Sequence, residues 1–236
     1  MIRIMMIMLM LVSGSSVLAN EIYIDQIGDN LDLDITQDGQ DNKVGTSTTD
    51  MGLTGDDMTF AITQTGNFNE IVATIKGTDY TGAWVFTGNT NTVDLACSAT
   101  ATGDCDTVTL NITTTGSDNT FDFDIGENND ADSATVTFTV TGDDSVINTD
   151  IDGTSAVLTV VMNNATSLAT TSTNSDQGNA LNIDIDGNGD SAGHTVILDI
   201  TGGGSTYDID QSGVNDATVN ATFDGDSQDV DITQSD

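Results

Sequence analysis

The chain has 236 residues, in which 38 acidic residues stand against three basic ones, and its formal net charge is −35 at pH 7. This charge argues strongly against nucleic acid and anionic membrane surfaces as partners, because both are bound through Lys and Arg. All but three of the acids are aspartate, proline is absent and 24 residues are glycine. Aspartate disfavours helices, while the abundant threonine and valine favour strands. The composition therefore predicts an all-β protein.

The first segment, "MIRIMMIMLMLVSGSSVLAN" (1–20), begins with one basic residue, Arg3, followed by an apolar run that ends near Val12. Small residues then precede Asn20, a pattern typical of a secretory signal peptide that is cleaved after Ala19. The apolar run is about 11 residues long, too short to span a bilayer. We therefore expect a mature chain of residues 20–236 that is secreted, extracellular or on the cell surface, and not inserted in a membrane.

Glycines recur at steps of 11 residues through much of the mature chain, and apolar residues take alternate positions between them. In "LDLDITQDG" (31–39), Leu, Leu, Ile and Gln share one face and Asp, Asp and Thr share the other, the pattern of a strand with one buried face. About 16 such arms, paired into coils of about 22 residues and stacked about 4.8 Å apart, would bury one continuous apolar row. The pattern predicts a single β-solenoid domain of seven or eight coils. An antiparallel sandwich or barrel of hairpins is the alternative.

Several arms place an amide side chain where the next inward apolar residue should fall. A buried amide without partners costs roughly a few kcal/mol, but amides at the same position of stacked coils can bond to one another in a ladder. An asparagine five residues after the glutamine suits the following turn, where Asn tolerates a positive φ. The expected ladder residues are Gln26, Gln37, Gln64, Gln211 and Gln234, and Asn42 and Asn69 are expected in the turns.

Three segments near 45–57, 97–105 and 163–179 have few residues suited to the core, and we expect them to be loops inserted in the stack. The second contains the only two cysteines, Cys97 and Cys105. In an exported protein this spacing predicts a local disulfide, which would stabilise the fold by about 2.5 kcal/mol.

Aspartate occupies the outward positions of many arms, so stacked coils would place like charges about 4.8 Å apart. We expect salt, acid or Ca²⁺ to strengthen stacking for this reason. "DIDGNGD" (184–190) resembles the first half of a calcium-binding loop, although Thr195 stands where a bidentate acid is expected. No cofactor is required; the candidate Ca²⁺ ligands are Asp184, Asp186, Asn188 and Asp190, and a solvated Asp-rich turn is the alternative reading.

Two further classes of function are less favoured. With one histidine, three basic residues and no grouping of a nucleophile with a base, the chain is not expected to be an enzyme. "TVTFTVT" (135–141) turns four threonines outward, as an ice-binding solenoid would, but neighbouring arms carry aspartate there. We therefore expect no threonine array that continues from coil to coil.

The segments "ITQDGQDN" (35–42) and "ITQTGNFN" (62–69) share the pattern I-T-Q-x-G-x-x-N, and "IDQIGDN" (24–30) and "IDQSGVND" (209–216) are close variants. This pattern resembles the curlin repeat of bacterial curli fibre subunits over residues 22–77 and 205–236. The resemblance implies a secreted fimbrial subunit that polymerises with itself or a related subunit into amyloid fibres for adhesion and biofilm. It also implies that Gln37, Asn42, Gln64 and Asn69 are ladder residues. Between these regions Thr, Asp or Val replaces the glutamine. The alternative is a monomeric acidic solenoid at the cell surface or in the periplasm that binds divalent cations or a partner.

Overall fold

Two parallel β-sheets face each other in a computed structural model that describes residues 20–97, 105–126, 133–142, 145–153, 156–163, 180–187, 195–201, 206–212, 218–224 and 229–235. Sheet A has 11 strands, and its main path runs β1-β4-β7-β9-β11-β13-β15-β17-β19 with β2 and β5 beside it. Sheet B has eight strands in the order β18-β16-β14-β12-β10-β8-β6-β3. Within these ranges there is no helix, and hence none of the length and apolarity that crossing a membrane requires.

The strands of sheet A are β1 (Glu21–Ile22), β2 (Asp25–Ile27), β4 (Lys43–Val44), β5 (Met51–Thr54), β7 (Glu70–Lys76), β9 (Thr92–Cys97), β11 (Thr120–Ile125), β13 (Val146–Gly153), β15 (Ala180–Gly187), β17 (Thr206–Ser212) and β19 (Asp229–Ser235). The strands of sheet B are β3 (Asp32–Asp38), β6 (Met58–Thr65), β8 (Tyr80–Thr87), β10 (Thr109–Thr115), β12 (Thr135–Thr141), β14 (Val157–Asn163), β16 (Thr195–Thr201) and β18 (Thr218–Asp224).

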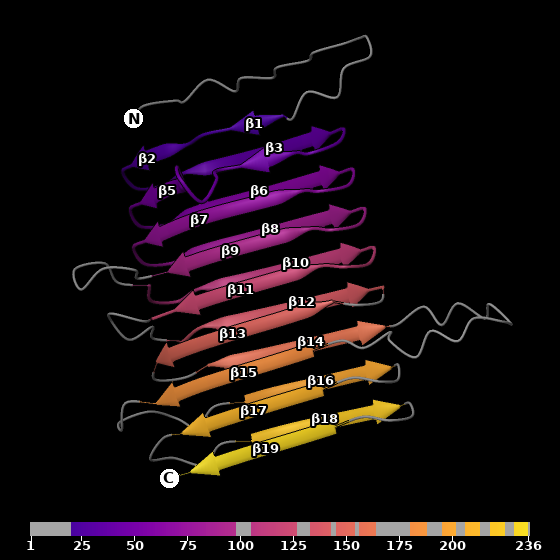
Figure 1. Cartoon of the computed structure of the whole chain (residues 1–236). Coiled ribbons are helices and arrows are strands. Elements are labelled where there is room, and N and C mark those ends of the chain that lie inside the picture. The colour runs from indigo at the N-terminus through magenta and orange to yellow at the C-terminus, as the bar shows by residue number, and fades with distance from the viewer. Residues whose placement is uncertain are drawn as a thin grey trace, which may run out of the picture.

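From β6 onwards the chain passes from one sheet to the other with each successive strand, so that every two arms complete one coil (Figure 1). Neighbours within a sheet are strands from successive coils, and every named pair is parallel; β6, for example, pairs with β3 and β8. The predicted β-solenoid is confirmed, and the antiparallel alternative is wrong. The expected coil length of 22 residues is found between Asn69 and Asn91. The next coil, from Asn91 to Asn119, is 28 residues long because it contains inserted residues.

The alternating pattern places apolar side chains between the two sheets. Along β8 the inward residues Tyr80, Trp84 and Phe86 are fully buried, whereas the outward residues between them are exposed. Aromatic rings from successive coils contact one another along the stack, and the ring centroids of Phe123 and Phe138 are 5.0 Å apart. Each coil thus completes the burial of its neighbours' apolar row, which is how a chain of single strands acquires a core.

The turns from sheet B to sheet A begin with a stacked column of glycines. Gly66 has a φ of 142°, and a Cβ atom placed on it would lie 1.4 Å from the carbonyl oxygen of Gly39 in the coil below. The second positive φ of each turn falls on the residue before the asparagine, such as Phe68 with a φ of 61°. The expectation that Asn42 and Asn69 use positive φ is therefore wrong. Their side chains close the turn by a hydrogen bond instead, as described below.

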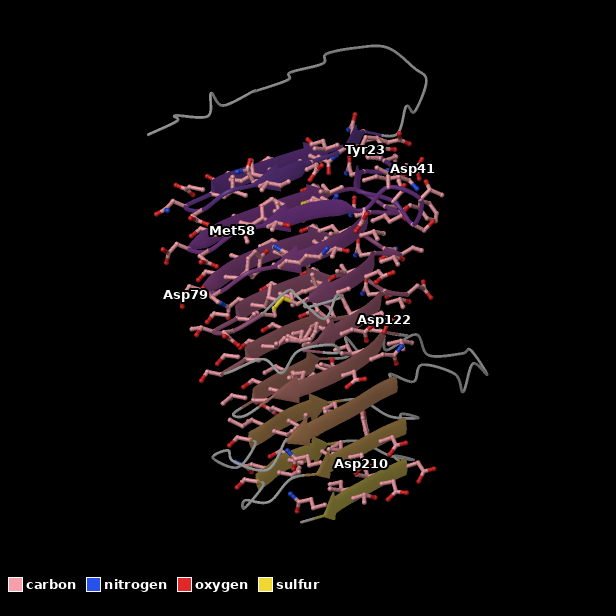
Figure 2. The ribbon with its side chains drawn as sticks, turned by 90° about the vertical axis from the view of Figure 1, so that its left-hand side faces the viewer. Tyr23, Asp41, Met58, Asp79, Asp122 and Asp210 are labelled. Atoms are coloured by element: carbon pink, nitrogen blue, oxygen red, sulfur yellow. A yellow bond between two sulfur atoms is a disulfide. The ribbon has the colours of Figure 1, made fainter. Side chains whose placement is uncertain are left out.

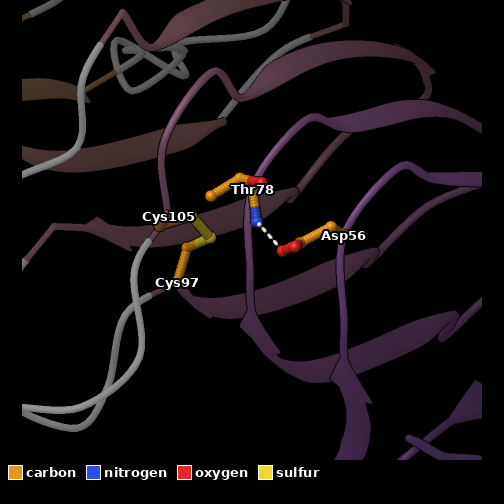
Figure 3. The surroundings of a disulfide bond; sticks show 4 residues. All are labelled: Asp56, Thr78, Cys97 and Cys105. Carbon is orange, nitrogen blue, oxygen red and sulfur yellow. Dashed lines mark hydrogen bonds between the residues drawn. A yellow bond between two sulfur atoms is a disulfide. The ribbon is translucent and has the colours of Figure 1, made fainter. Parts of the chain in front are cut away.

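The turns from sheet A to sheet B are closed differently. Apolar residues hold the position that asparagine holds at the opposite turns, and Leu31, Met58 and Tyr80 there are buried. The Asp56 carboxylate accepts a hydrogen bond from the backbone N–H of Thr78 in the next coil at 3.0 Å, next to the disulfide between Cys97 and Cys105 (Figure 3). These contacts keep successive turns in register.

The inserted loops differ in part from expectation. Residues 51–54 form β5, which pairs with β2 and β7, so the segment 45–57 is not a loop throughout. Its looped part is short and is closed by an antiparallel bridge between Thr46 and Thr49. Alternating burial explains the strand, because Met51 and Leu53 are both fully buried. The signal peptide (1–19) and the segments 98–104 and 164–179 lie outside the described residues.

Candidate assembly edges and amide ladders

An asparagine ladder runs along the turns from sheet B to sheet A. The Nδ2 group of Asn42 donates to Oδ1 of Asn69 at 2.9 Å, Asn69 donates to Asn91 at 2.7 Å, and Asn91 donates to Asn119 at 2.7 Å. Asn20 donates to Asn42 at one end, and Asn119 donates to the hydroxyl of Ser145 at the other. The four asparagines from Asn42 to Asn119 are buried. Each Nδ2 also donates to the carbonyl of the glycine three residues earlier, so one side chain joins two coils and closes its own turn.

Sequence reasoning placed Asn42 and Asn69 in this ladder but missed Asn20, Asn91, Asn119 and Ser145. The signal was the G-x-x-N spacing alone, which "GNTN" (88–91) and "GSDN" (116–119) retain. The glutamine that accompanies it in the earlier arms is replaced by Phe86 and Thr114. The turn, rather than the glutamine, is therefore the feature that repeats from coil to coil.

Glutamine pairs occur at the two ends of the stack, in different sheets. In sheet B, Nε2 of Gln64 donates to Oε1 of Gln37 at 2.7 Å, and both side chains are buried. In sheet A, Nε2 of Gln234 donates to Oε1 of Gln211 at 2.9 Å. The predicted ladder position of Gln26 is wrong within the chain, because its register partner is Leu53.

In the register of each sheet, an apolar residue of the neighbouring coil adjoins each glutamine pair. Gln64 is in register with Phe86, and its Oε1 is a buried atom without a hydrogen-bond partner. Gln211 is in register with Ile185, and its Nε2 is likewise buried without a partner. Each such atom costs roughly 1–3 kcal/mol. Amides are thus used at the ends of the stack at a cost in stability, while the same columns in between hold apolar residues and, in sheet B, Thr114.

Gln26 and Gln234 occupy the same inward column of sheet A, at opposite ends. Following the register pairs along sheet A leads from Gln26 through seven intervening residues to Gln234: Leu53, Ile75, Cys97, Ile125, Ile151, Ile185 and Gln211. Register pairs that run through β1 and β4 lead in the same way from Glu21 to Asp229 and from Ile22 to Val230. The two ends of sheet A therefore present matching rows of side chains.

Apolar side chains are exposed at both of these edges. Val230 and Ile232 on β19 are 39% and 41% exposed, although Tyr207 and Ile209, in the same columns one coil earlier, are almost fully buried. At the other end, Ile22 and Ile24 are partly buried and Ile27 is 80% exposed. Strands β3, β18 and β19 each have one strand partner among the described residues. An edge with exposed apolar residues and unpaired backbone groups is a template for another strand.

The outward faces of the two sheets differ in charge. On sheet A, one outward column contains Asp94, Asp122 and, further along, Asp208 and Asp231, and the adjacent column contains further aspartates. Asp122 and Asp210 lie along the same side of the stack in Figure 2. A hollow on this side is lined by Asp122, Asp124, Asn148, Asp150, Asp208 and Asp210.

Two of the four predicted calcium ligands lie on a strand of sheet A. Asp184 and Asp186 lie on β15, where Asp184 is in register with Asp150 and Asp210. Asn188 and Asp190 lie outside the described residues. The register thus places Asp184 beside aspartates of the neighbouring coils. The loop spacing that suggested the site does not include them.

Sheet B presents a threonine face, by which we mean the outward residues of β6, β8, β10 and β12. Of these 16 positions 12 are threonine, and none is charged: Thr59, Ala61, Thr63, Thr65, Thr81, Ala83, Val85, Thr87, Thr109, Asn111, Thr113, Thr115, Thr135, Thr137, Thr139 and Thr141. The expectation that the array stops at one arm is wrong. The arms that follow β12 and precede it in sequence belong to sheet A, whereas its neighbours in space are β10 and β14.

Replacing Asp94 by asparagine is expected to raise the melting temperature at pH 7. Burial, and then the charges of Asp122 and Asp50, raise the pKa of Asp94 above its usual value. A carboxyl whose pKa is raised by folding destabilises the folded state once it is ionised, so the gain should shrink as the pH falls through that pKa. Circular dichroism melts over a pH series measure this. Asp34→Asn, next to the neutral Ala61 in its column, is the control; an equal gain from both variants would contradict the argument.

Comparison with known proteins gives no match: no family model fits the chain, and no curated protein or solved structure shows significant similarity to it.

Proposed function

We propose that the chain is a secreted structural protein that assembles end to end into fibres, in which the N-terminal edge of one copy continues the C-terminal edge of another. The observation that carries this proposal is the common column of Gln26 and Gln234 at opposite ends of sheet A. Because all stacked strands are parallel, a second copy can extend both sheets without reversing direction.

The contacts of such a junction follow from the register. In sheet A, Gln26 of the next copy would lie on Gln234, and its Nε2 would repeat the donation that Gln234 makes to Gln211. Ile22 would cover Val230, which is 39% exposed at the free edge. In sheet B, Gln37 would lie on Phe223, a contact that already exists inside the chain between Gln64 and Phe86. The junction therefore uses pairings of the kind that the fold tolerates within itself.

Charge opposes this junction at its outer positions. Glu21 of one copy would meet Asp229 of the other, both of them exposed. Like charges at strand spacing repel each other, and salt, protons or divalent cations reduce that repulsion. We infer that assembly is promoted by salt, acid or Ca²⁺, with the acidic face of sheet A as a further place for cations. The resemblance to the curlin repeat and the N-terminal signal pattern support a fibre subunit for adhesion or biofilm outside the cell.

Incubation of the mature chain (20–236) with salt or Ca²⁺ tests the proposal by electron microscopy and thioflavin fluorescence. We expect fibres from the unmodified chain and none from Ile232→Lys, which places a charge in the inward row of the C-terminal edge. Ile197→Lys is the matched control: Ile197 is 38% exposed, close to the 41% of Ile232, but it faces outward on β16, a strand that is already paired on both sides, with β14 and β18. A chain that remains monomeric under all these conditions would favour a cation-binding or partner-binding monomer instead.

A further inference from the structure

The threonine face repeats regularly in two directions. The register from β6 to β12 contains no bulge, so the outward residues form columns such as Thr63, Val85, Thr113 and Thr139. Residues two apart on a strand lie about 6.6 Å from one another, and adjacent strands lie about 4.8 Å apart. The strands of this sheet follow one another with little change in direction (Figure 1). The result is a planar grid of hydroxyl and methyl groups.

The side chains of this grid have little freedom. Threonine and valine are stiff at χ1 because of the branch at Cβ. Behind them the inward residues Phe60, Trp84, Leu110 and Phe138 are fully buried, so the backbone of the face rests on a closely packed core. The positions of the hydroxyl groups are thus fixed by the fold before any ligand arrives.

We propose that the threonine face binds the surface of ice. A fixed grid of hydroxyls can donate to and accept from water molecules at lattice positions, because both of its repeats are near the spacings between oxygen atoms on ice planes. The interleaved methyl groups of Thr, Ala61, Ala83 and Val85 favour release of water that is not in the lattice. This proposal does not rest on end-to-end assembly, since the face lies between the two edges.

The distribution of charge favours this ligand. The chain has 38 acidic residues, yet none occupies the 16 positions of the threonine face, while the outward columns of sheet A carry aspartates such as Asp94 and Asp122. A carboxylate holds its own hydration shell, which does not match a crystal surface. Only the face free of carboxylates therefore suits contact with ordered water.

A second copy of the chain is a poorer fit to this face. Four strands of seven residues span about 19 Å by 23 Å, so two copies packed face to face would each bury about 450 Å², well below the 800 Å² or so of a standard interface. The remaining surface of each copy is strongly acidic, with a total charge of −35 per chain. Electrostatic repulsion between the two copies would further disfavour this small interface, whereas ice is neutral and is not repelled by the chain.

Measurement of thermal hysteresis, the gap between the melting and freezing temperatures of an ice crystal in the protein solution, tests the proposal on the monomeric mature chain. We expect a gap for the unmodified chain and its loss in Thr113→Lys, which puts a long charged side chain at the centre of the face. Thr92→Lys is the matched control, because Thr92 is an exposed outward residue of β9 on sheet A; we expect it to keep the gap.

Circular dichroism of both variants establishes that they fold, and partition into a slowly growing ice crystal gives a second readout. A folded unmodified chain that shows no gap and is excluded from ice would overturn the proposal, as would equal gaps in the two variants. A stable dimer that Thr113→Lys dissociates, without any gap, would assign the face to a second copy instead.

Discussion

Replacing Gly66 by alanine is expected to destabilise the protein by about 4 kcal/mol or more, at the upper end of single substitutions. The new Cβ atom would lie 1.4 Å from the carbonyl oxygen of Gly39, and the φ of 142° is one that alanine rarely adopts. Neither problem can be relieved locally, because Gly39 and Gly88 stack on either side of Gly66 and fix the spacing of the coils. The loss is a large part of the free energy of unfolding of a folded domain, which is roughly 5–15 kcal/mol.

Urea unfolding, followed by the fluorescence of Trp84, measures this effect. Trp84 is the only tryptophan and is fully buried, and it lies on β8, the strand that pairs with β6 just before Gly66. Gly52→Ala is the control, because Gly52 has no positive φ and its new Cβ would approach only the Asp25 side chain, at 3.4 Å. We expect the control to change the free energy of unfolding by less than about 1 kcal/mol. Similar losses in both variants would show that the stacked turns tolerate side chains.

The sequence predicted the solenoid because strand alternation is a local property. In 31–37, Leu31, Ile35 and Gln37 alternate with residues that tolerate water, and their burial in the structure follows that parity. A strand whose residues alternate in this way has one inward face whatever its neighbours are. The parity of each arm was therefore readable without knowing how the arms stack.

The columns along the stack could not be read in the same way. Steps between successive ladder asparagines vary, from 22 residues between Asn69 and Asn91 to 28 between Asn91 and Asn119. Without the true coil lengths, Thr113 cannot be placed beside Thr139, nor Gln26 in the column of Gln234. The threonine face and the matching edges are thus properties of the register, and the register depends on inserted residues whose path the sequence does not specify.

Replacing Asn91 by aspartate is expected to cost about 3–5 kcal/mol at pH 7, because it puts an uncompensated charge in the middle of the asparagine ladder. Asn91 is fully buried, and its Nδ2 donates to the carbonyl oxygen of Gly88 at 2.6 Å and to Oδ1 of Asn119 at 2.7 Å. Aspartate has the same shape, but an ionised carboxylate would present an acceptor to both of these acceptors. The substitution changes two donated hydrogen bonds into two repulsive contacts and leaves the packing volume unchanged.

The loss should depend on pH with a defined sign. Burial and the facing oxygens raise the folded-state pKa of the new carboxyl above its unfolded value of about 3.9. The variant is therefore least destabilised below pH 4 or so, where the carboxyl is protonated in both states, and loses stability as the pH rises through the raised pKa. The difference in unfolding free energy between variant and unmodified chain, measured by urea at several pH values, isolates this effect from the other acids.

Asn89→Asp is the matched control for this experiment. Asn89 lies in the same turn but is exposed, and its Oδ1 accepts a hydrogen bond from the backbone N–H of Ser117 at 2.8 Å, which a carboxylate can also accept. We expect this variant to stay within about 0.5 kcal/mol of the unmodified chain. A loss at Asn91 that is independent of pH, or equal to that at Asn89, would mean that shape rather than donated hydrogen bonds holds successive coils together. The expected contrast instead makes the amide N–H groups the element that fixes each coil on the next, so that exchanging one amide NH2 group for a carboxylate oxygen in this column weakens the stack.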